Sequence, residues 1–147
     1  MKITEILMAE HAVFHNLFDH LERNVLRLKT LAELKTLAAA LEALLRAHAN
    51  TEDELFFAPL EHCLEQIGQS ETFHEEHEEI DQSLLDVQKA KQVGVARQRL
   101  TQAVLACREH FDKEERVMFP LAERTLKSDT LQALGAAWTK RREAALK

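Results

Sequence analysis

The stretch from Val93 to Leu121 reads VGVARQRLTQAVLACREHFDKEERVMFPL. Within it, one set of side chains recurs at alternating steps of three and four residues: Val93, Ala96, Leu100, Ala103, Cys107, His110, Glu114, Val117 and Leu121. Side chains with this spacing share one face of an α-helix. Because the face is largely apolar, the pattern predicts a long helix that packs into a core, with His110 and Glu114 inside that core.

The same alternating pattern occurs in three further stretches, at residues 7–28, 34–59 and 73–87. Glycine and proline, which interrupt helices, number only 3 and 2. Short connections between helices favour antiparallel neighbours. We therefore expect an all-α fold, an up-down-up-down antiparallel four-helix bundle over about residues 4–125. A short additional C-terminal helix is expected at about residues 129–146, docked on the bundle through Trp138 or using it as a dimer contact.

The expected helix boundaries carry recognisable capping residues. Thr30 with Glu33 and Thr72 with Glu75 both have the spacing of a capping box, in which a hydroxyl and a carboxylate satisfy backbone N–H groups reciprocally. Gly68 lies in the expected gap before the second of these boxes. The sequence thus predicts helix starts directly after Thr30 and Thr72.

Composition favours one soluble domain spanning residues 1–147. A net charge of -6 gives no basic footprint for nucleic acid or an anionic membrane surface. The apolar runs are too short to span a membrane, and the N-terminal segment lacks a signal-peptide core. Two cysteines, Cys63 and Cys107, are too few for a disulfide framework. A cytoplasmic location is therefore expected.

Polar residues interrupt all four apolar stripes. Each stripe contains a histidine, and two contain a glutamate four residues later: His11, His48 with Glu52, His77, and His110 with Glu114. Each histidine lies about 14 to 17 residues along its helix from the expected turn that joins it to the next helix of its hairpin. At a rise of 1.5 Å per residue, the four histidines therefore reach a common height in the bundle. An ionised glutamate in an apolar core is costly unless a positive charge meets it, and the stripes offer no lysine or arginine at that level. A metal cation is the simplest partner.

The chain also repeats itself. Residues 48–57 (HANTEDELFF) align with residues 110–119 (HFDKEERVMF), and a proline follows each segment within two residues. Residues 10–14 likewise echo residues 76–80. Two helical hairpins that each supply a histidine and then a His-x-x-x-Glu segment would form a pseudo-twofold site. This ligand set suits two metal ions bridged by the two glutamates.

Taken in order, these residues resemble the hemerythrin-like proteins, or HHE cation-binding domains, over about residues 5–125. The resemblance rests on the Phe-Pro endings and on six residues: His11, His48, Glu52, His77, His110 and Glu114. It implies a non-haem di-iron centre with terminal histidines, bridging carboxylates and an oxo or hydroxo bridge. Such a centre binds dioxygen or related small molecules, and members of the broader group act in iron sensing, peroxide handling and nitric oxide responses.

Two positions depart from the oxygen-carrying members of that family. Those carry a further histidine four residues before the position of His77, where this chain has Phe73. They also have an aspartate five residues after the histidine of the fourth helix, whereas here Glu114 stands at four and Glu115 at five. The missing ligand argues against reversible oxygen carriage.

Other side chains near the site allow more than one interpretation. His15 and His74 lie one turn from His11 and His77 on slightly different faces, so each is either a further metal ligand or a hydrogen-bond donor to a ligating carboxylate. Glu115 has the same two interpretations. Two more histidines are expected to face solvent: His20 and His62. Five aromatic residues are expected to shield the site: Phe14, Phe56, Phe57, Phe111 and Phe119.

Imidazole and carboxylate ligands suit iron, with manganese or zinc as alternatives, and argue against copper-thiolate or all-oxygen calcium sites. Three functions stay open. The favoured one is a protein that binds or senses dioxygen, peroxide, nitric oxide or iron through a pair of iron ions. The alternatives are a di-iron enzyme acting on peroxide or as an oxidase, and a structural bundle that holds an adventitious ion. The absence of tyrosine disfavours tyrosyl-radical oxidase chemistry. A diatomic or peroxide ligand and a signalling partner or second copy are the expected partners.

Overall fold

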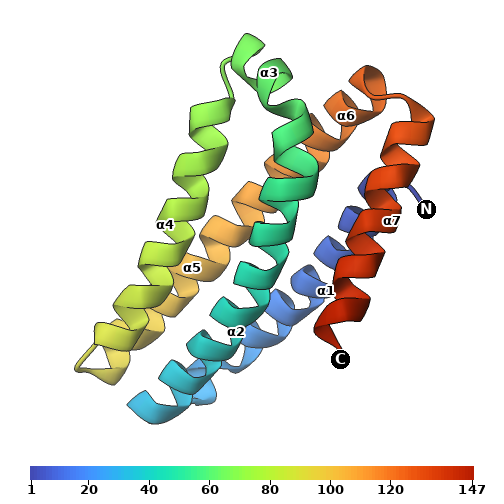
Figure 1. The fold of residues 1–147 in the computed structure, drawn as a ribbon. Coiled ribbons are helices and arrows are strands. Elements are labelled where there is room, and N and C mark those ends of the chain that lie inside the picture. The colour runs from blue at the N-terminus through green and yellow to red at the C-terminus, as the bar shows by residue number, and fades with distance from the viewer.

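The computed structural model describes all 147 residues, and every regular element is helical (Figure 1). Four long helices lie alongside one another: α1 (Ile3–Asn24), α2 (Leu31–Glu52), α4 (Ser70–Lys89) and α5 (Val93–Lys113). The other elements are η1 (Val25–Arg27), η2 (Asp53–Phe57), α3 (Ala58–Gln66), η3 (Glu114–Met118), α6 (Phe119–Thr125) and α7 (Ser128–Ala145). The predicted all-α fold is confirmed. None of these helices combines the length and apolar character that crossing a membrane requires.

The two predicted capping boxes have different outcomes. Thr30 caps α2 as expected, because its hydroxyl accepts from the Glu33 backbone N–H at 3.1 Å and the Glu33 carboxylate accepts from the Thr30 N–H at 3.0 Å. The box predicted at Thr72 is wrong, since α4 already begins at Ser70 and Thr72 lies inside its first turn. The Ser70 hydroxyl instead donates a hydrogen bond to Glu61 of α3, which ties the start of α4 to the preceding helix.

Helices α2 and α5 each continue through a π-helical turn, η2 or η3, into α3 or α6. Each π turn is followed by a proline, Pro59 or Pro120. A proline within an α-helix lacks an N–H and presses on the carbonyl four residues back, whereas a π turn is wider and bonds five residues back. Glu52 directly precedes η2 and Glu114 opens η3. Both core glutamates therefore stand where a helix widens, a feature that is frequent at functional sites.

The apolar core consists of two clusters on either side of a polar layer. One cluster lies toward the α1–α2 and α4–α5 connections and includes Phe18, Leu41, Leu84 and Leu100. The other gathers the start of α1, both π turns and the short helices, and includes Leu7, Phe56, Phe73, Met118 and Trp138. Along each long helix, the candidate ligands lie between members of the two clusters.

The last helix, α7, lies against α1 (Figure 1). Its bounds differ by one residue at each end from the extra helix expected from sequence. Leu131 and Trp138 are buried, and Trp138 is only 1% exposed, so this side chain docks the helix on the bundle. Gly135 permits the close approach, because a Cβ there would collide with the Met1 carbonyl oxygen.

Candidate metal centre

Six side chains converge in the polar layer between the two apolar clusters. They form two overlapping groups of four, and within each group the candidate ligand atoms lie within 4.8 Å of one another. The first group is His11, His48, Glu52 and Glu114, and the second is Glu52, His77, His110 and Glu114. All are buried except His77, whose side chain is 17% exposed. The structure therefore brings together all six ligand candidates taken from the sequence.

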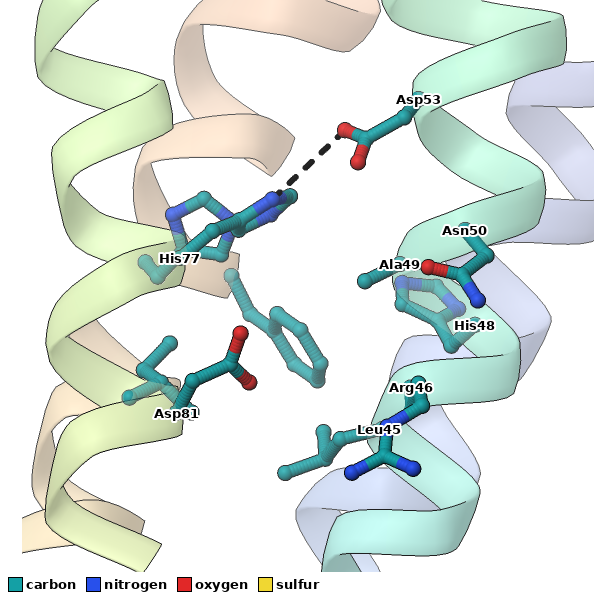
Figure 2. A pocket seen from close by; sticks show the side chains of 11 residues that line it. Leu45, Arg46, His48, Ala49, Asn50, Asp53, His77 and Asp81 are labelled. Carbon is teal, nitrogen blue, oxygen red and sulfur yellow. Dashed lines mark ion pairs between the residues drawn. The ribbon is translucent and has the colours of Figure 1, made fainter. Parts of the chain in front are cut away.

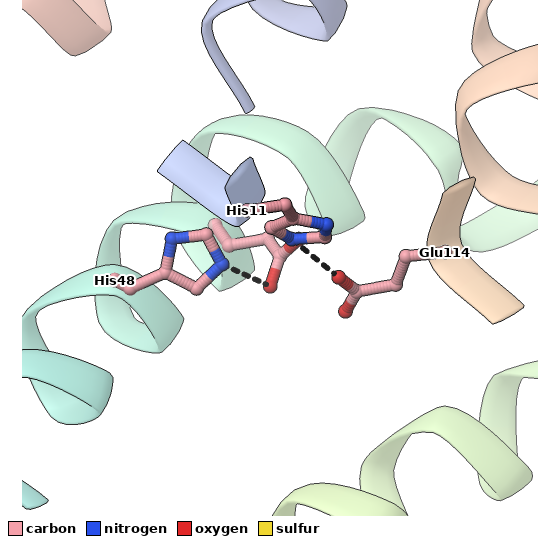
Figure 3. Close-up of side chains that lie close together, drawn as sticks. His11, His48 and Glu114 are labelled. Carbon is pink, nitrogen blue, oxygen red and sulfur yellow. Dashed lines mark ion pairs between the residues drawn. The ribbon is translucent and has the colours of Figure 1, made fainter. Parts of the chain in front are cut away.

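Glu114 faces histidines from both helical hairpins. Its Oε2 lies 3.1 Å from His11 Nε2 on α1, and its Oε1 lies 2.5 Å from His110 Nε2 on α5. Figure 3 shows His11 and His48 side by side, with the Glu114 carboxylate reaching toward His11. The carboxylate is fully buried. Its two oxygens thus contact two different histidines, one from each helical hairpin.

Glu52 has the corresponding position in the other half of the layer. Its Oε2 lies 3.6 Å from His48 Nε2 on the same helix and 3.9 Å from His77 Nε2 on α4. Like Glu114, it is fully buried and belongs to both groups of four. The two carboxylates therefore have the placement that a pair of bridging ligands requires.

The residues fit a cation because their inward atoms are otherwise unpaired. The Nε2 atoms of His11, His48 and His110 and all four carboxylate oxygens of Glu52 and Glu114 are buried, and their polar contacts are only with other atoms of the layer. A buried polar atom left unpaired costs about 1–3 kcal/mol, and more when it is charged. Imidazole nitrogens and carboxylate oxygens all bind cations through a lone pair. A cation at this place would therefore satisfy the whole set together.

Without a cation, protons held by Glu52 and His110 offset the negative charge of the layer. Burial and the nearby Glu114 raise the pKa of Glu52 well above its usual value. Burial would also raise the pKa of Glu114, but the adjacent His110 holds it well below. Burial would lower the pKa of His110, yet Glu114 raises it to about 9. A metal that binds these groups must displace protons from them, so metal binding and proton release are linked.

Each of the four histidines directs its other ring nitrogen, Nδ1, to a carboxylate outside the layer. The pairs are His48 with Glu10 at 2.8 Å, His110 with Glu76 at 2.8 Å, His11 with Glu115 at 3.0 Å, and His77 with Asp53 at 3.6 Å. Figure 2 marks the last of these ion pairs. Burial would raise the pKa of Glu10, but its hydrogen bonds with His48 and Arg142 lower it to about 2. Carboxylates in this position fix the imidazole orientation and leave Nε2 free to bind a metal.

Sequence reasoning missed Glu10, Glu76 and Asp53, although the internal repeat contains the signal. Glu10 and Glu76 stand directly before the histidines of α1 and α4, while Asp53 and Glu115 directly follow the two core glutamates. In each half, the residue before the first histidine contacts the second histidine of the same hairpin. The residue after each glutamate contacts a histidine of the other hairpin. The repeat thus covers the outer carboxylates as well as the six inner residues.

The other histidine candidates lie outside the two groups of four. His15 Nε2 contacts Glu115 Oε1 at 3.2 Å, so this histidine lies behind the carboxylate that contacts His11. His74 is 52% exposed, and its Nε2 lies 3.5 Å from Glu61 Oε2. Two more histidines are exposed as expected: His20 and His62. The structure therefore favours a supporting position for His15 and a surface position for His74.

A cavity of about 100 Å³ lies between α2 and α4 beside the second group (Figure 2). Three of the candidate ligands line it: His48, His77 and His110. Its other polar side chains include Arg46, Asp53 and Asp81. His77 is also the most exposed of the six, and the other five are exposed by 2% or less. The cavity therefore gives a small molecule of a few atoms a path to the layer, next to His48, His77 and His110.

Aromatic rings enclose the rest of the layer. Phe111 stacks on His11, with ring centroids 4.0 Å apart and planes 7° from parallel. Phe57 contacts His77 edge-on, with centroids 5.7 Å apart. Phe73, at the position where oxygen carriers have a histidine, packs 5.8 Å from the His110 ring. These side chains exclude water, but Phe73 supplies no ligand to the second group.

The chain matches the family model described as the hemerythrin HHE cation binding domain over residues 2–122. The match includes all six inner residues and ends before α7 begins. Comparisons with curated proteins and with solved structures gave no significant match.

Proposed function

The chain belongs to the hemerythrin HHE cation-binding domain family, and on that premise we propose that it is a non-haem di-iron protein that binds or senses a small ligand. Metal binding is supported by the family and by the two groups of histidines and glutamates. The observation that carries the dinuclear assignment is that Glu52 and Glu114 belong to both groups. We also propose the antiparallel up-down-up-down order for the bundle, which the short connections between long helices support.

The proposed ligands divide between two metal positions. His11 and His48 would hold the first metal, His77 and His110 would hold the second, and the two glutamates would bridge them. Imidazole and carboxylate donors favour iron, with manganese or zinc as alternatives. Each metal would then have four protein ligands, which leaves open positions on a six-coordinate ion. When bound, the two iron ions would act as redox-active Lewis acids toward a small molecule at those positions.

The small ligand is proposed to reach the second position. His48, His77 and His110 all line the cavity between α2 and α4, but His77 is by far the most exposed of the six candidate ligands. Phe73 adds no ligand to the second position. Dioxygen, peroxide and nitric oxide are of the size that this cavity accepts. A sensor would transmit its state to a second copy or a separate signalling protein. The alternative, an enzyme acting on peroxide, is favoured by the same cavity because it gives a reactant direct access.

Metal stoichiometry tests the dinuclear assignment. Protein reconstituted with iron is expected to hold two metal ions per chain, because the shared glutamates couple the two positions. The ferric pair is also expected to absorb in the near ultraviolet. Elemental analysis and an optical spectrum measure both. A reproducible single metal, or weak binding that scales with the amount added, would instead support a mononuclear or adventitious site.

The roles of His74 and His77 are separated by a matched pair of substitutions. His74→Ala is expected to retain two metals with unchanged affinity, because this side chain is exposed and faces Glu61. His77→Ala removes a proposed ligand and is expected to weaken the second position on the order of 100-fold or more. Competition with a chelator measures both affinities. Loss of metal in His74→Ala comparable to that in His77→Ala would place His74 among the ligands.

A further inference from the structure

The carboxylate of Glu10 connects α7 to the metal layer. Its Oε2 contacts His48 Nδ1 at 2.8 Å. On its other side, Glu10 Oε1 accepts hydrogen bonds from Trp138 Nε1 at 3.0 Å and from Arg142 Nε at 2.9 Å, and Arg142 Nη2 reaches Oε2 at 3.3 Å. Two side chains of the last helix therefore hold the carboxylate that holds His48.

Trp138 and Arg142 make further contacts beyond those with Glu10. Trp138 is 1% exposed, and its ring packs edge-on against the His48 ring, with centroids 5.9 Å apart. The Arg142 guanidinium lies over the Trp138 ring, 5.1 Å from its centroid, and also donates to the Ala47 carbonyl of α2 at 3.3 Å. Arg142 thus spans α1 and α2 at the level of the metal layer. This geometry places a set of hydrogen-bond donors from α7 around Glu10.

The repeat-related half of the layer lacks such a helix. There Glu76 contacts His110 Nδ1 at 2.8 Å, and its further partner is Lys113, whose side chain is 48% exposed. Lys113 belongs to α5, the same helix as His110. This half also has the partly exposed His77, which lines the cavity together with His110 and with His48 of the other half. The two halves therefore share inner ligands but differ in the groups that hold their outer carboxylates.

We propose that α7 is a functional part of the metal centre: Trp138 and Arg142 are positioning residues that fix Glu10 against His48. They make the His11 and His48 position the tighter of two unequal metal positions. The His77 and His110 position, which α7 does not cover, is then the one that exchanges metal and takes up an external ligand. This inference rests on the proposed dinuclear site. Its physical basis is that a carboxylate held in place orients its imidazole and lowers the cost of ordering the ligand.

The test uses Co²⁺ as the probe, because its visible spectrum reports the ligand geometry while competition with a chelator gives two dissociation constants. Trp138→Phe keeps an aromatic ring in the core and removes the N–H donor to Glu10, together with part of the packing volume of the indole. It is expected to weaken the tighter position by about 10- to 100-fold, leave the weaker position unchanged and alter the spectrum of the first equivalent bound. The matched control is Lys113→Met, which removes the partner of Glu76 and should leave the tighter position unchanged.

A double-mutant cycle tests whether Trp138 affects the metal position through Glu10. Glu10→Gln should reproduce the loss seen in Trp138→Phe, and the double variant should lose no more than Glu10→Gln alone, because Trp138 acts through Glu10. Additive losses would overturn that route. Lower melting temperatures with both Co²⁺ affinities and the spectrum unchanged would also overturn the proposal and leave α7 as packing alone. If the wild-type protein binds two Co²⁺ ions in those experiments, the proposed dinuclear site stands whatever the variants do. If it binds fewer than two, both the dinuclear site and this inference are wrong.

Discussion

Glu52→Gln and Glu114→Gln are each expected to abolish tight binding at both metal positions. Each glutamate belongs to both groups of candidate ligands, so one substitution removes a charged oxygen donor from two metals at once. Glutamine has nearly the same shape but no negative charge. The expected loss in affinity is on the order of 1,000-fold or more, which corresponds to about 4 kcal/mol. Metal analysis after reconstitution measures the loss, and circular dichroism should show that the helices remain.

The same two variants should differ when no metal is present. Burial and Glu114 raise the pKa of Glu52 well above its usual value, which favours the neutral form of this side chain, and glutamine imitates that form. Metal-free Glu52→Gln should therefore unfold within about 1 kcal/mol of the metal-free wild type. Glu114 is ionised beside His110, and removing one partner of a buried ion pair costs about 3–5 kcal/mol. Urea unfolding in a chelator measures the difference.

Equal unfolding free energies for the two metal-free variants would contradict this assignment of charge. A second contradiction would be a variant that keeps two tightly bound metals, since that would remove its carboxylate from the bridging set. An informative control is His20→Ala, because this exposed histidine lies about two and a half helical turns beyond His11 on α1. It should change neither the metal affinity nor the free energy of unfolding by more than about 0.5 kcal/mol. The pair of measurements thus separates loss of metal from loss of fold.

The inner site could be predicted from sequence because it depends on helical spacing alone. His48 and Glu52 stand four residues apart on one apolar stripe, and His110 and Glu114 repeat them, so a regular helix brings each pair to one face. The common height of the histidines follows from equal distances to the turns. The family match over residues 2–122 agrees with the ordered set.

The outer carboxylates could not be placed in the same way. Glu10 precedes a candidate ligand in sequence, but it contacts His48 on the neighbouring helix, and that pairing depends on how the helices are rotated against each other. The π turns are a further departure from regular helical spacing, because one follows Glu52 directly and the other begins at Glu114. The role of Trp138 was open for a similar reason: apolar spacing indicates burial, but it does not give the partner of the indole N–H. The wrong cap at Thr72 reflects local competition, since α4 begins at Ser70, three residues earlier than predicted, where Ser70 contacts Glu61.

Removal of metal from the wild-type protein is expected to lower its melting temperature strongly. A ligand present at 1,000 times its dissociation constant stabilises the folded state by about 4 kcal/mol. For a domain of this size, that corresponds to a shift of roughly 8–16 °C. The stabilisation arises because each bridging glutamate would join histidines of both hairpins through the metals, and because the unpaired buried atoms would gain partners. Calorimetry of the protein with excess Zn²⁺ and with chelator measures the shift.

The control for this measurement is Glu52→Gln, whose metal-free form is expected to resemble the metal-free wild type. Its melting temperature should be nearly insensitive to Zn²⁺, because the ion has lost a ligand common to both positions. If the variant gained as much stability from Zn²⁺ as the wild type does, the ion would be binding elsewhere on this acidic chain, whose net charge is -6. Equal melting temperatures of wild-type protein with and without metal would mean that solvated charges, and not a metal site, fill the polar layer. A large shift confined to the wild type would instead tie the stability of the bundle to the two glutamates at its centre.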